Sequence, residues 1–135
     1  MNPTSKLERT ALVVDDSNLL CELLKDSLIE LGFDNVLVAN DGKQAVSAYK
    51  RNTIHLTFLD LEMPKQNGIE TLKEIKAINK DAYVVIVSGT GTADSVKKAI
   101  VLGAKGFIVK PCSPSKIAEA VTKFNATHTE LRFNE

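Results

Sequence analysis

The sequence has little cysteine and no excess of charge of either sign, and both shortages exclude classes of protein. Lysine and arginine together number 17, as do aspartate and glutamate, so the formal net charge is zero. A protein that holds a nucleic-acid backbone usually carries a basic excess, so direct nucleic-acid binding is disfavoured. Cys21 and Cys112 lie far apart in the sequence and fit no metal-ligand spacing, and we expect both to be reduced thiols.

Long hydrophobic runs are also missing. No apolar stretch approaches the roughly 18 residues that span a bilayer, and residues 1–6 lack the apolar core of a signal peptide. We therefore expect a cytoplasmic protein without a membrane partner. The 135 residues fit one domain, which at this length buries about two thirds of its unfolded surface. Neither a metal nor a disulfide is needed for such a chain to fold.

Short apolar runs alternate with segments of helical spacing along the chain. The runs, which are predicted to be strands, cover 11–14, 35–39, 54–60, 83–87 and 106–109. Helices are predicted at 17–31, after the turn at 41–42, and at 69–78, 92–102 and 113–124. In the fourth of these helices, Ala93, Val96 and Ile100 are expected to face inward.

Strands and helices in strict alternation predict an α/β fold. Each strand is continuously apolar rather than alternating, which is typical of a parallel sheet with helices on both faces. The predicted architecture is a doubly wound, flavodoxin-like sheet of five parallel strands with five helices. The sequence places this domain at 10–124, between a flexible tail at 1–9 and a polar tail at 125–135 that we expect to be disordered.

The third strand ends abruptly in a carboxylate. The apolar run up to Leu59 is followed by Asp60, and Pro64 interrupts the chain shortly afterwards. We interpret this pattern as a buried strand that presents Asp60 at the rim of the sheet, so that the carboxylate itself is not buried. An aspartate after a strand is more often a turn residue or a helix cap. A functional role for Asp60 therefore needs support from residues at the other strand ends.

Polar side chains stand at four strand ends. They are the acid pair Asp15 and Asp16, then Asp60, Ser88 and Lys110. In doubly wound sheets, function gathers beyond these carboxyl ends. Carboxylates brought together there repel each other by about 4 kcal/mol per close pair at an effective dielectric near 20. A hard divalent cation such as Mg²⁺ would compensate, with Lys110 as a further fixed positive charge.

Such a site suits the transfer of an anionic group. The metal screens an incoming phosphoryl group, and one aspartate can attack it as nucleophile. Ser88 offers a hydroxyl donor, and Gly89 leaves its backbone N–H open to a phosphate oxygen. Taken singly, the residues have simpler explanations, with either acid of the pair as a helix N-cap. Ser88 could be a turn residue, and Lys110 a solvated charge.

The combination of these strand ends resembles the receiver domain of bacterial two-component response regulators, in its stand-alone, CheY-like form, over residues 10–124. The resemblance implies that Asp60 accepts a phosphoryl group and contributes to the metal site. It also implies that Asp16 ligates Mg²⁺ directly and that Asp15 acts largely through water. Glu62 is expected to offer its backbone carbonyl to the metal.

The resemblance assigns further site residues. Ser88 is the switch hydroxyl, and Lys110 is the lysine that pairs with the phosphoryl group. The backbone N–H groups of Leu61 and Gly89 are expected to bind phosphate oxygens. Phe107 stands where the family places an aromatic switch residue, although a role in core packing is an alternative.

Two loops carry the resemblance as well. The pair Met63-Pro64, followed by Gly68, matches the usual loop after the phosphoacceptor, and the Lys110–Pro111 peptide is expected to be cis. Glu62 departs from the most frequent pattern, because it adds a further carboxylate near the site. We expect this carboxylate to change how fast the phosphoryl group is lost.

The implied function is a phosphorylation-activated switch that works through other proteins. A histidine kinase or a histidine phosphotransfer protein would donate the phosphoryl group, and the chain would catalyse only its own phosphorylation and dephosphorylation. A downstream protein, in chemotaxis or a phosphorelay, would bind the face formed by the fourth helix, the fifth strand and the fifth helix. Two alternatives remain: a scaffold that binds partners without phosphorylation, and a hydrolase of the haloacid dehalogenase type.

Overall fold

The computed structural model describes residues 8–63 and 67–128, which contain five strands and five helices in alternation. The strands are β1 (Thr10–Val14), β2 (Asn35–Ala39), β3 (Leu56–Asp60), β4 (Val84–Ser88) and β5 (Gly106–Val109). The helices are α1 (Asn18–Glu30), α2 (Gly42–Arg51), α3 (Gly68–Ile78), α4 (Ala93–Val101) and α5 (Pro114–Thr127). Every predicted element is present. Across these described residues, no helix has the length and apolar character needed to cross a membrane.

The strands form one parallel sheet with the order β2-β1-β3-β4-β5. The order of the strands reverses between β1 and β3, and in doubly wound sheets ligands bind beyond the strand ends at such a switch point. Asp60 ends β3 at this point, and Asp15 and Asp16 follow directly after β1. The topology thus brings together acids that lie far apart in the sequence.

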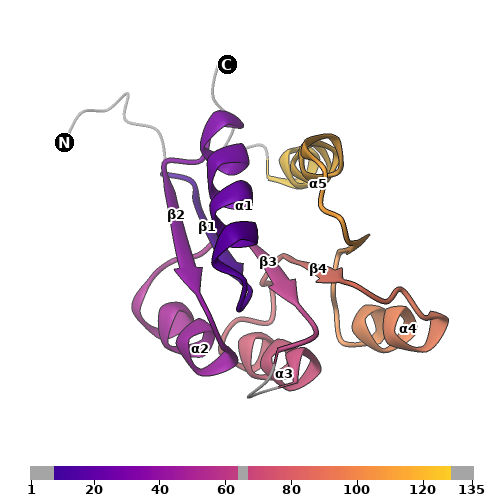
Figure 1. The fold of residues 1–135 in the computed structure, drawn as a ribbon. Coiled ribbons are helices and arrows are strands. Elements are labelled where there is room, and N and C mark those ends of the chain that lie inside the picture. Colours follow the sequence, from indigo (N-terminus) through magenta and orange to yellow (C-terminus); the bar gives the residue numbers. More distant parts are fainter. Residues whose placement is uncertain (1–7, 64–66, 129–135) are drawn as a thin grey trace.

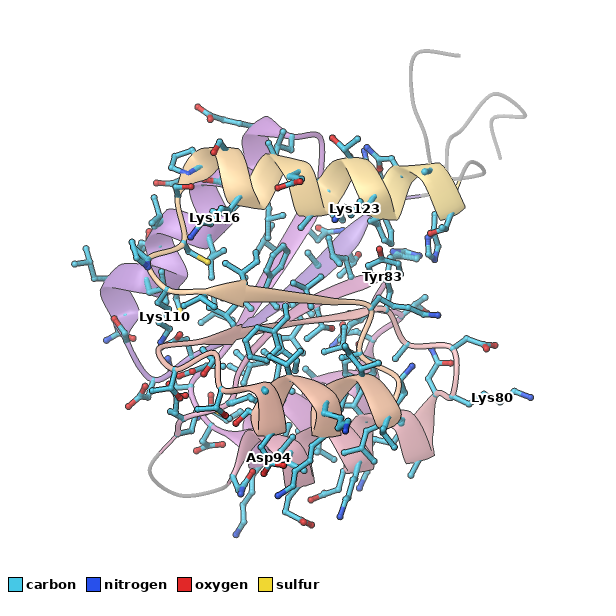
Figure 2. The ribbon with its side chains drawn as sticks, turned by 90° about the vertical axis from the view of Figure 1, so that its right-hand side faces the viewer. Lys80, Tyr83, Asp94, Lys110, Lys116 and Lys123 are labelled. Atoms are coloured by element: carbon cyan, nitrogen blue, oxygen red, sulfur yellow. The ribbon has the colours of Figure 1, made fainter. Side chains whose placement is uncertain are left out.

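Helices cover both faces of the sheet, which explains why the strands are continuously apolar (Figure 1). Ala11 and Val13 of β1 pack with side chains of α1 and α5, whereas Leu12 and Val14 pack with side chains of α2, α3 and α4. Figure 2 shows these layers from the side, with α5 above the strands and α4 below them. The predicted doubly wound fold is confirmed.

Each helix begins at a side chain that satisfies a free backbone N–H group. These N-cap residues accept a hydrogen bond from an N–H two or three residues later, and they are Ser17, Asp41, Asn67, Thr92 and Ser113. Such a cap is worth about 1 kcal/mol. Because Ser17 is the N-cap of α1, Asp15 and Asp16 are not N-caps, and their carboxylates can take part in the site at the end of the sheet.

The inward face of α4 differs from the prediction. Ala99 is fully buried, whereas Ile100 is 59% exposed and Ala93 is exposed too. The buried stripe runs through the half-buried Val96 and Leu102 on either side of Ala99. The helix therefore packs through its smallest side chain, because a small residue lets the helix backbone approach the sheet closely. The expectation that Ala93 and Ile100 face inward is wrong.

The described ends of the domain also differ from the predicted tails. Arg9 falls within the predicted N-terminal tail, but it is 3% exposed and its backbone N–H donates to Asp34 Oδ2 at 2.8 Å. At the other end, α5 continues to Thr127 and so includes the start of the tail predicted at 125–135. Residues 1–7 and 129–135 of the two predicted tails lie outside the described residues.

Candidate functional site

Four strand ends place polar side chains at one edge of the sheet. Asp60 is the last residue of β3 and Ser88 is the last residue of β4, while Asp15 and Lys110 follow directly after β1 and β5. Because these strands are parallel and lie in the order β1-β3-β4-β5, their carboxyl ends meet. Lys110 marks this end of the sheet in Figure 2. The structure therefore brings together the side chains that the sequence singled out.

Asp15, Asp16 and Asp60 form an acidic cluster, in which one carboxylate oxygen from each residue lies within 4.8 Å of the others. Asp16 is exposed, whereas Asp15 and Asp60 are each 1% exposed. The expectation that the Asp60 carboxylate is presented rather than buried is therefore wrong. The reason is that β3 is the central strand, and the Lys110 side chain from the end of β5 lies against the Asp60 carboxylate.

Lys110 supplies the positive charge of the site. Its Nζ lies 3.3 Å from Asp15 Oδ2 and 3.5 Å from Asp60 Oδ1. Burial lowers the pKa of the ammonium group, but the two carboxylates outweigh burial, so the pKa of Lys110 is raised. A single ammonium group cannot neutralise three carboxylates, and the acidic cluster with Lys110 keeps a net negative charge.

The environment of Asp60 raises its pKa to about 6. Burial is the largest cause and the charge of Asp15 adds to it, whereas the Glu62 N–H, which donates to Asp60 Oδ1 at 3.1 Å, and the Lys110 ammonium act in the opposite direction. Asp60 Oδ2 is buried and has no hydrogen-bond partner among the described residues. Buried polar atoms are normally satisfied, so this oxygen is available to another ligand.

The donor set of the acidic cluster fits a divalent cation. Asp15 Oδ2 is the second buried oxygen without a hydrogen bond in the described part of the chain, although the Lys110 ammonium lies 3.3 Å from it. Hard oxygen ligands with a net negative charge are those that Mg²⁺ prefers, and an exposed acid such as Asp16 leaves room for the waters that Mg²⁺ usually keeps.

The Glu62 side chain takes part in the site in a way that the sequence did not reveal. Its carboxylate accepts hydrogen bonds from the Ser88 hydroxyl, from the Gly89 N–H at 2.9 Å and from the Thr90 hydroxyl at 3.0 Å. Burial raises the pKa of Glu62, but these hydrogen bonds and Lys110 outweigh it, so the pKa is lowered. The sequence analysis expects a backbone carbonyl ligand and an extra carboxylate at Glu62, but it does not predict these side-chain contacts, because they depend on how β3 pairs with β4.

The backbone N–H of Leu61 does not face the site. It donates to Val87 O at 3.1 Å, so the pairing of β3 with β4 continues one residue beyond Asp60. The expectation that this N–H binds a phosphate oxygen is therefore not supported. The next N–H in the chain, that of Glu62, is the one directed at the Asp60 carboxylate.

Phe107 and the Lys110–Pro111 peptide border the site on the side of β5. Phe107 is half-buried and packs against the core beneath α2, α3 and α4, which suits both the switch role and the core role that the sequence left open. The Lys110–Pro111 peptide is cis. In the loop after β3, Met63 is buried, and Pro64 lies outside the described residues.

The two cysteines are buried thiols. Both are free, and Cys21 Sγ donates to Asp15 O at 3.3 Å. Burial is the main reason why the pKa of Cys21 is raised to about 11 and why that of Cys112 is raised as well. A raised pKa leaves little of the reactive thiolate at neutral pH.

Known proteins are similar to this chain in sequence and in fold. Residues 11–122 match the family model of the response regulator receiver domain. Chemotaxis protein CheY of Bacillus subtilis is 41% identical over 112 residues, which cover 83% of this chain and 93% of that protein. Chemotaxis protein CheY of Thermotoga maritima is 37% identical over 115 residues, which cover 85% of this chain and 96% of that protein.

Solved structures lead to the same family. A CheY-like receiver domain protein from Methanospirillum hungatei has a TM-score of 0.85 at 21% identity over 92% of this chain and 99% of that chain, which concerns the fold alone. The CheX-CheY-BeF3-Mg+2 complex from Borrelia burgdorferi has a TM-score of 0.82 at 36% identity over 85% of this chain and 87% of that chain. The chain belongs to the family of response regulator receiver domains, the CheY-like, phosphorylation-activated switches of two-component signalling.

Proposed function

We propose that Asp60 accepts the phosphoryl group, with the help of Mg²⁺. The observation that carries this proposal is the buried Asp60 carboxylate, which lies in one acidic cluster with Asp15 and Asp16, 3.5 Å from Lys110 Nζ. One of its oxygens has no hydrogen-bond partner in the described residues. The Borrelia burgdorferi relative supports the proposal, since that structure holds CheY together with BeF3 and Mg²⁺.

The proposed chemistry is a transfer of a phosphoryl group to a carboxylate. One oxygen of Asp60 forms a bond to phosphorus while the bond from phosphorus to the leaving atom of the donor breaks, and the leaving group departs with that electron pair. Asp15, Asp16 and Asp60, with the backbone carbonyl of Glu62, would hold Mg²⁺, which when bound screens the repulsion between carboxylates and phosphoryl oxygens. Lys110 offers its ammonium group to a phosphoryl oxygen.

Ser88 couples the site to the surface in this proposal. After the transfer its hydroxyl donates to a phosphoryl oxygen and moves toward Asp60, and Phe107 turns inward into the space that is left. This movement remodels the face of α4, β5 and α5, which is turned toward the viewer in Figure 2. Switching a population from 1:99 to 99:1 requires about 5.5 kcal/mol, which several charge-assisted hydrogen bonds can supply.

The proposed partners are proteins. The phosphoryl donor is a histidine kinase or a histidine phosphotransfer protein, and a downstream protein of chemotaxis or a phosphorelay binds the face of α4, β5 and α5. The relatives named chemotaxis protein CheY, and the relative in complex with CheX, favour chemotaxis. The chain itself catalyses only its own phosphorylation and dephosphorylation. A cytoplasmic location and the lack of direct nucleic-acid binding stay predictions.

Intact-mass spectrometry tests the role of Asp60. The protein is incubated with a small acyl phosphate, with and without Mg²⁺, as wild type, as Asp60→Asn and as the control Asp26→Asn, whose acid is exposed on α1. We expect one Mg²⁺-dependent phosphoryl adduct in the wild type and the control and none in Asp60→Asn. No adduct under any condition would instead favour a scaffold that works without phosphorylation.

A further inference from the structure

The Glu62 carboxylate occupies the hydrogen-bond donors that the proposed switch needs. The Gly89 N–H donates to Glu62 Oε1 at 2.9 Å, while the hydroxyls of Ser88 and Thr90 donate to Oε2. These donors lie at the end of β4 and directly after it, and Glu62 reaches them from the segment that follows β3. A carboxylate thus lies where the proposed function requires phosphoryl oxygens.

The Ser88 hydroxyl can serve only one acceptor at a time, because it has a single proton. Its oxygen lies within hydrogen-bond distance of Glu62 Oε2 and also of Thr90 O, at 2.9 Å from the latter. The Thr90 N–H donates to the same Ser88 oxygen at 3.2 Å. A phosphoryl oxygen can therefore gain this hydroxyl proton only when Glu62 and Thr90 O give it up.

We propose that Glu62 is an internal competitor of the phosphoryl group: its carboxylate holds Ser88 and Gly89 in the unphosphorylated protein, and phosphorylation of Asp60 displaces it. This inference rests on the proposed function of Asp60. Both groups are oxyanions that need the same donors, and two negative groups cannot share them without strong repulsion. Glu62 is thus a positioning residue that opposes the active arrangement of Ser88.

The structure lets the Glu62 side chain leave at low cost. Glu62 is exposed, unlike the buried Asp60, so its carboxylate can turn into water without unpacking the core. Gly89 permits the close approach that the contact needs, because a Cβ at this position would lie 3.3 Å from Glu62 Oε1. The contact can therefore form and break by movement of one side chain.

Three variants distinguish the effect of the hydrogen bonds to Glu62 from the effect of its negative charge. E62D keeps the charge but shortens the side chain by a methylene, so the carboxylate no longer reaches the Gly89 N–H. E62Q keeps the length but replaces one acceptor oxygen by an amide donor. E70A removes an exposed acid from the first turn of α3 and is the control. All of them keep the backbone carbonyl of residue 62, which is the proposed metal ligand.

The first readout needs neither phosphorylation nor metal. The Gly89 amide is followed by NMR in the Mg²⁺-free protein, through its proton chemical shift and its hydrogen-exchange rate. We expect the Gly89 amide proton to shift upfield and to exchange faster in E62D, because the shorter carboxylate no longer reaches it, and to stay unchanged in E70A. The carbonyl oxygen of the glutamine in E62Q can still accept this hydrogen bond, so E62Q should change the Gly89 amide less than E62D does. If the chemical shift and the exchange rate of the Gly89 amide in E62D matched those of the wild type, the hydrogen bond from Gly89 to Glu62 would be ruled out.

The second readout is the affinity for beryllofluoride in the presence of Mg²⁺, measured by NMR titration, together with the rate of adduct formation with a small acyl phosphate. We expect E62D and E62Q to bind beryllofluoride about tenfold more tightly than the wild type, a gain of about 1.4 kcal/mol. Both variants should also form the adduct faster. E70A should match the wild type in both measurements.

The remaining outcomes of the second readout are distinguishable. A gain in E62Q with none in E62D would show that only the charge matters, which overturns the competition for donors. Equal affinity in all variants would overturn it as well. If the wild type neither binds beryllofluoride nor forms an adduct, the proposed function of Asp60 is wrong. The proposed competition between Glu62 and the phosphoryl group is then wrong as well.

Discussion

At the scale of single residues, the site concentrates negative charge in a small buried volume. Asp15 and Asp60 are each 1% exposed, and the Lys110 ammonium contacts both of them. Buried carboxylates close to each other are costly unless a proton or a cation neutralises them. The pKa of Asp60, raised to about 6 mainly by burial, reflects this cost. The feature that suits the site to a cation therefore destabilises the metal-free protein.

Asp60→Asn should stabilise the metal-free protein at neutral pH, by about 1–3 kcal/mol. The pKa of Asp60 rises from 3.8 to about 6 on folding, so between these values the folded state binds more protons than the unfolded state. Wild-type stability therefore falls as the pH rises through this window, and the advantage of Asp60→Asn shrinks as the pH is lowered. Urea unfolding with a chelator, at neutral pH and near pH 4, measures both effects.

Asp26→Asn serves as the control for this measurement, because Asp26 is exposed on α1. Its free energy of unfolding should differ little from that of the wild type at either pH, since surface substitutions usually change stability by less than about 0.5 kcal/mol. If Asp60→Asn were no more stable than the wild type at neutral pH, burial of the Asp60 charge would carry no cost.

At the scale of elements, the connection from β3 to α3 sets the position of Asp60. Gly68 is the first residue of α3, and a Cβ there would lie 2.5 Å from Leu61 Cα and 2.7 Å from Asp60 O. Both of these are backbone atoms, which cannot yield unless the end of β3 moves. The missing side chain of Gly68 therefore lets α3 begin directly against the residue that carries the proposed chemistry.

Gly68→Ala should lower the free energy of unfolding by about 2–4 kcal/mol and slow the phosphorylation of Asp60, because the added methyl group displaces the end of β3. Gly106→Ala is the matched control, since a Cβ there would meet the side chain of Val85 at 3.5 Å, an ordinary contact. Urea unfolding and intact mass after incubation with an acyl phosphate provide the two measurements. Equal results for the two variants would rule out the steric argument.

At the scale of the whole molecule, the acidic site and the contact between Arg9 and α5 lie at opposite ends of the sheet. Arg9 precedes β1, and its guanidinium carbon lies 4.4 Å from the centroid of the Phe33 ring. Its Nη2 donates to Asn125 Oδ1 in the last turns of α5. Burial lowers the pKa of Arg9, and the nearby charge of Asp34 opposes this effect. Arg9 thus ties the first strand to the last helix.

Arg9→Ala should lower the free energy of unfolding by about 2–3 kcal/mol, because it removes both the stacking on Phe33 and the hydrogen bond to Asn125. Asp60 should still be phosphorylated in the folded variant, since the acidic site lies at the other end of the strands. Glu8→Ala, at an exposed neighbouring position, is the control and should have little effect. Thermal unfolding followed by circular dichroism measures the stability, and the mass assay measures the phosphorylation. If Arg9→Ala were as stable as the wild type, the contacts of Arg9 with Phe33 and Asn125 would not stabilise the protein.

Much of the fold and of the site could be predicted from local signals. Apolar runs and segments of helical spacing indicated every element, and the ends of parallel strands necessarily meet at one edge, which placed Asp60, Ser88 and Lys110 together. Exposure was harder to predict, since Asp60 is buried and α4 packs through Ala99 rather than Ile100. Apolar spacing favours the larger side chains, whereas close packing of a helix on a sheet can select the smallest one.

Local features of the sequence predict the alternation of strands and helices, where the helices begin, and which acids and which lysine stand at the strand ends. These features depend on residues near each other in the chain. The three-dimensional fold is needed to establish the strand order, the burial of Asp60 and the hydrogen bonds from Ser88 and Gly89 to Glu62. These depend on which strands pair and how closely they approach, and the periodicity of a single segment carries no information about its neighbours in space.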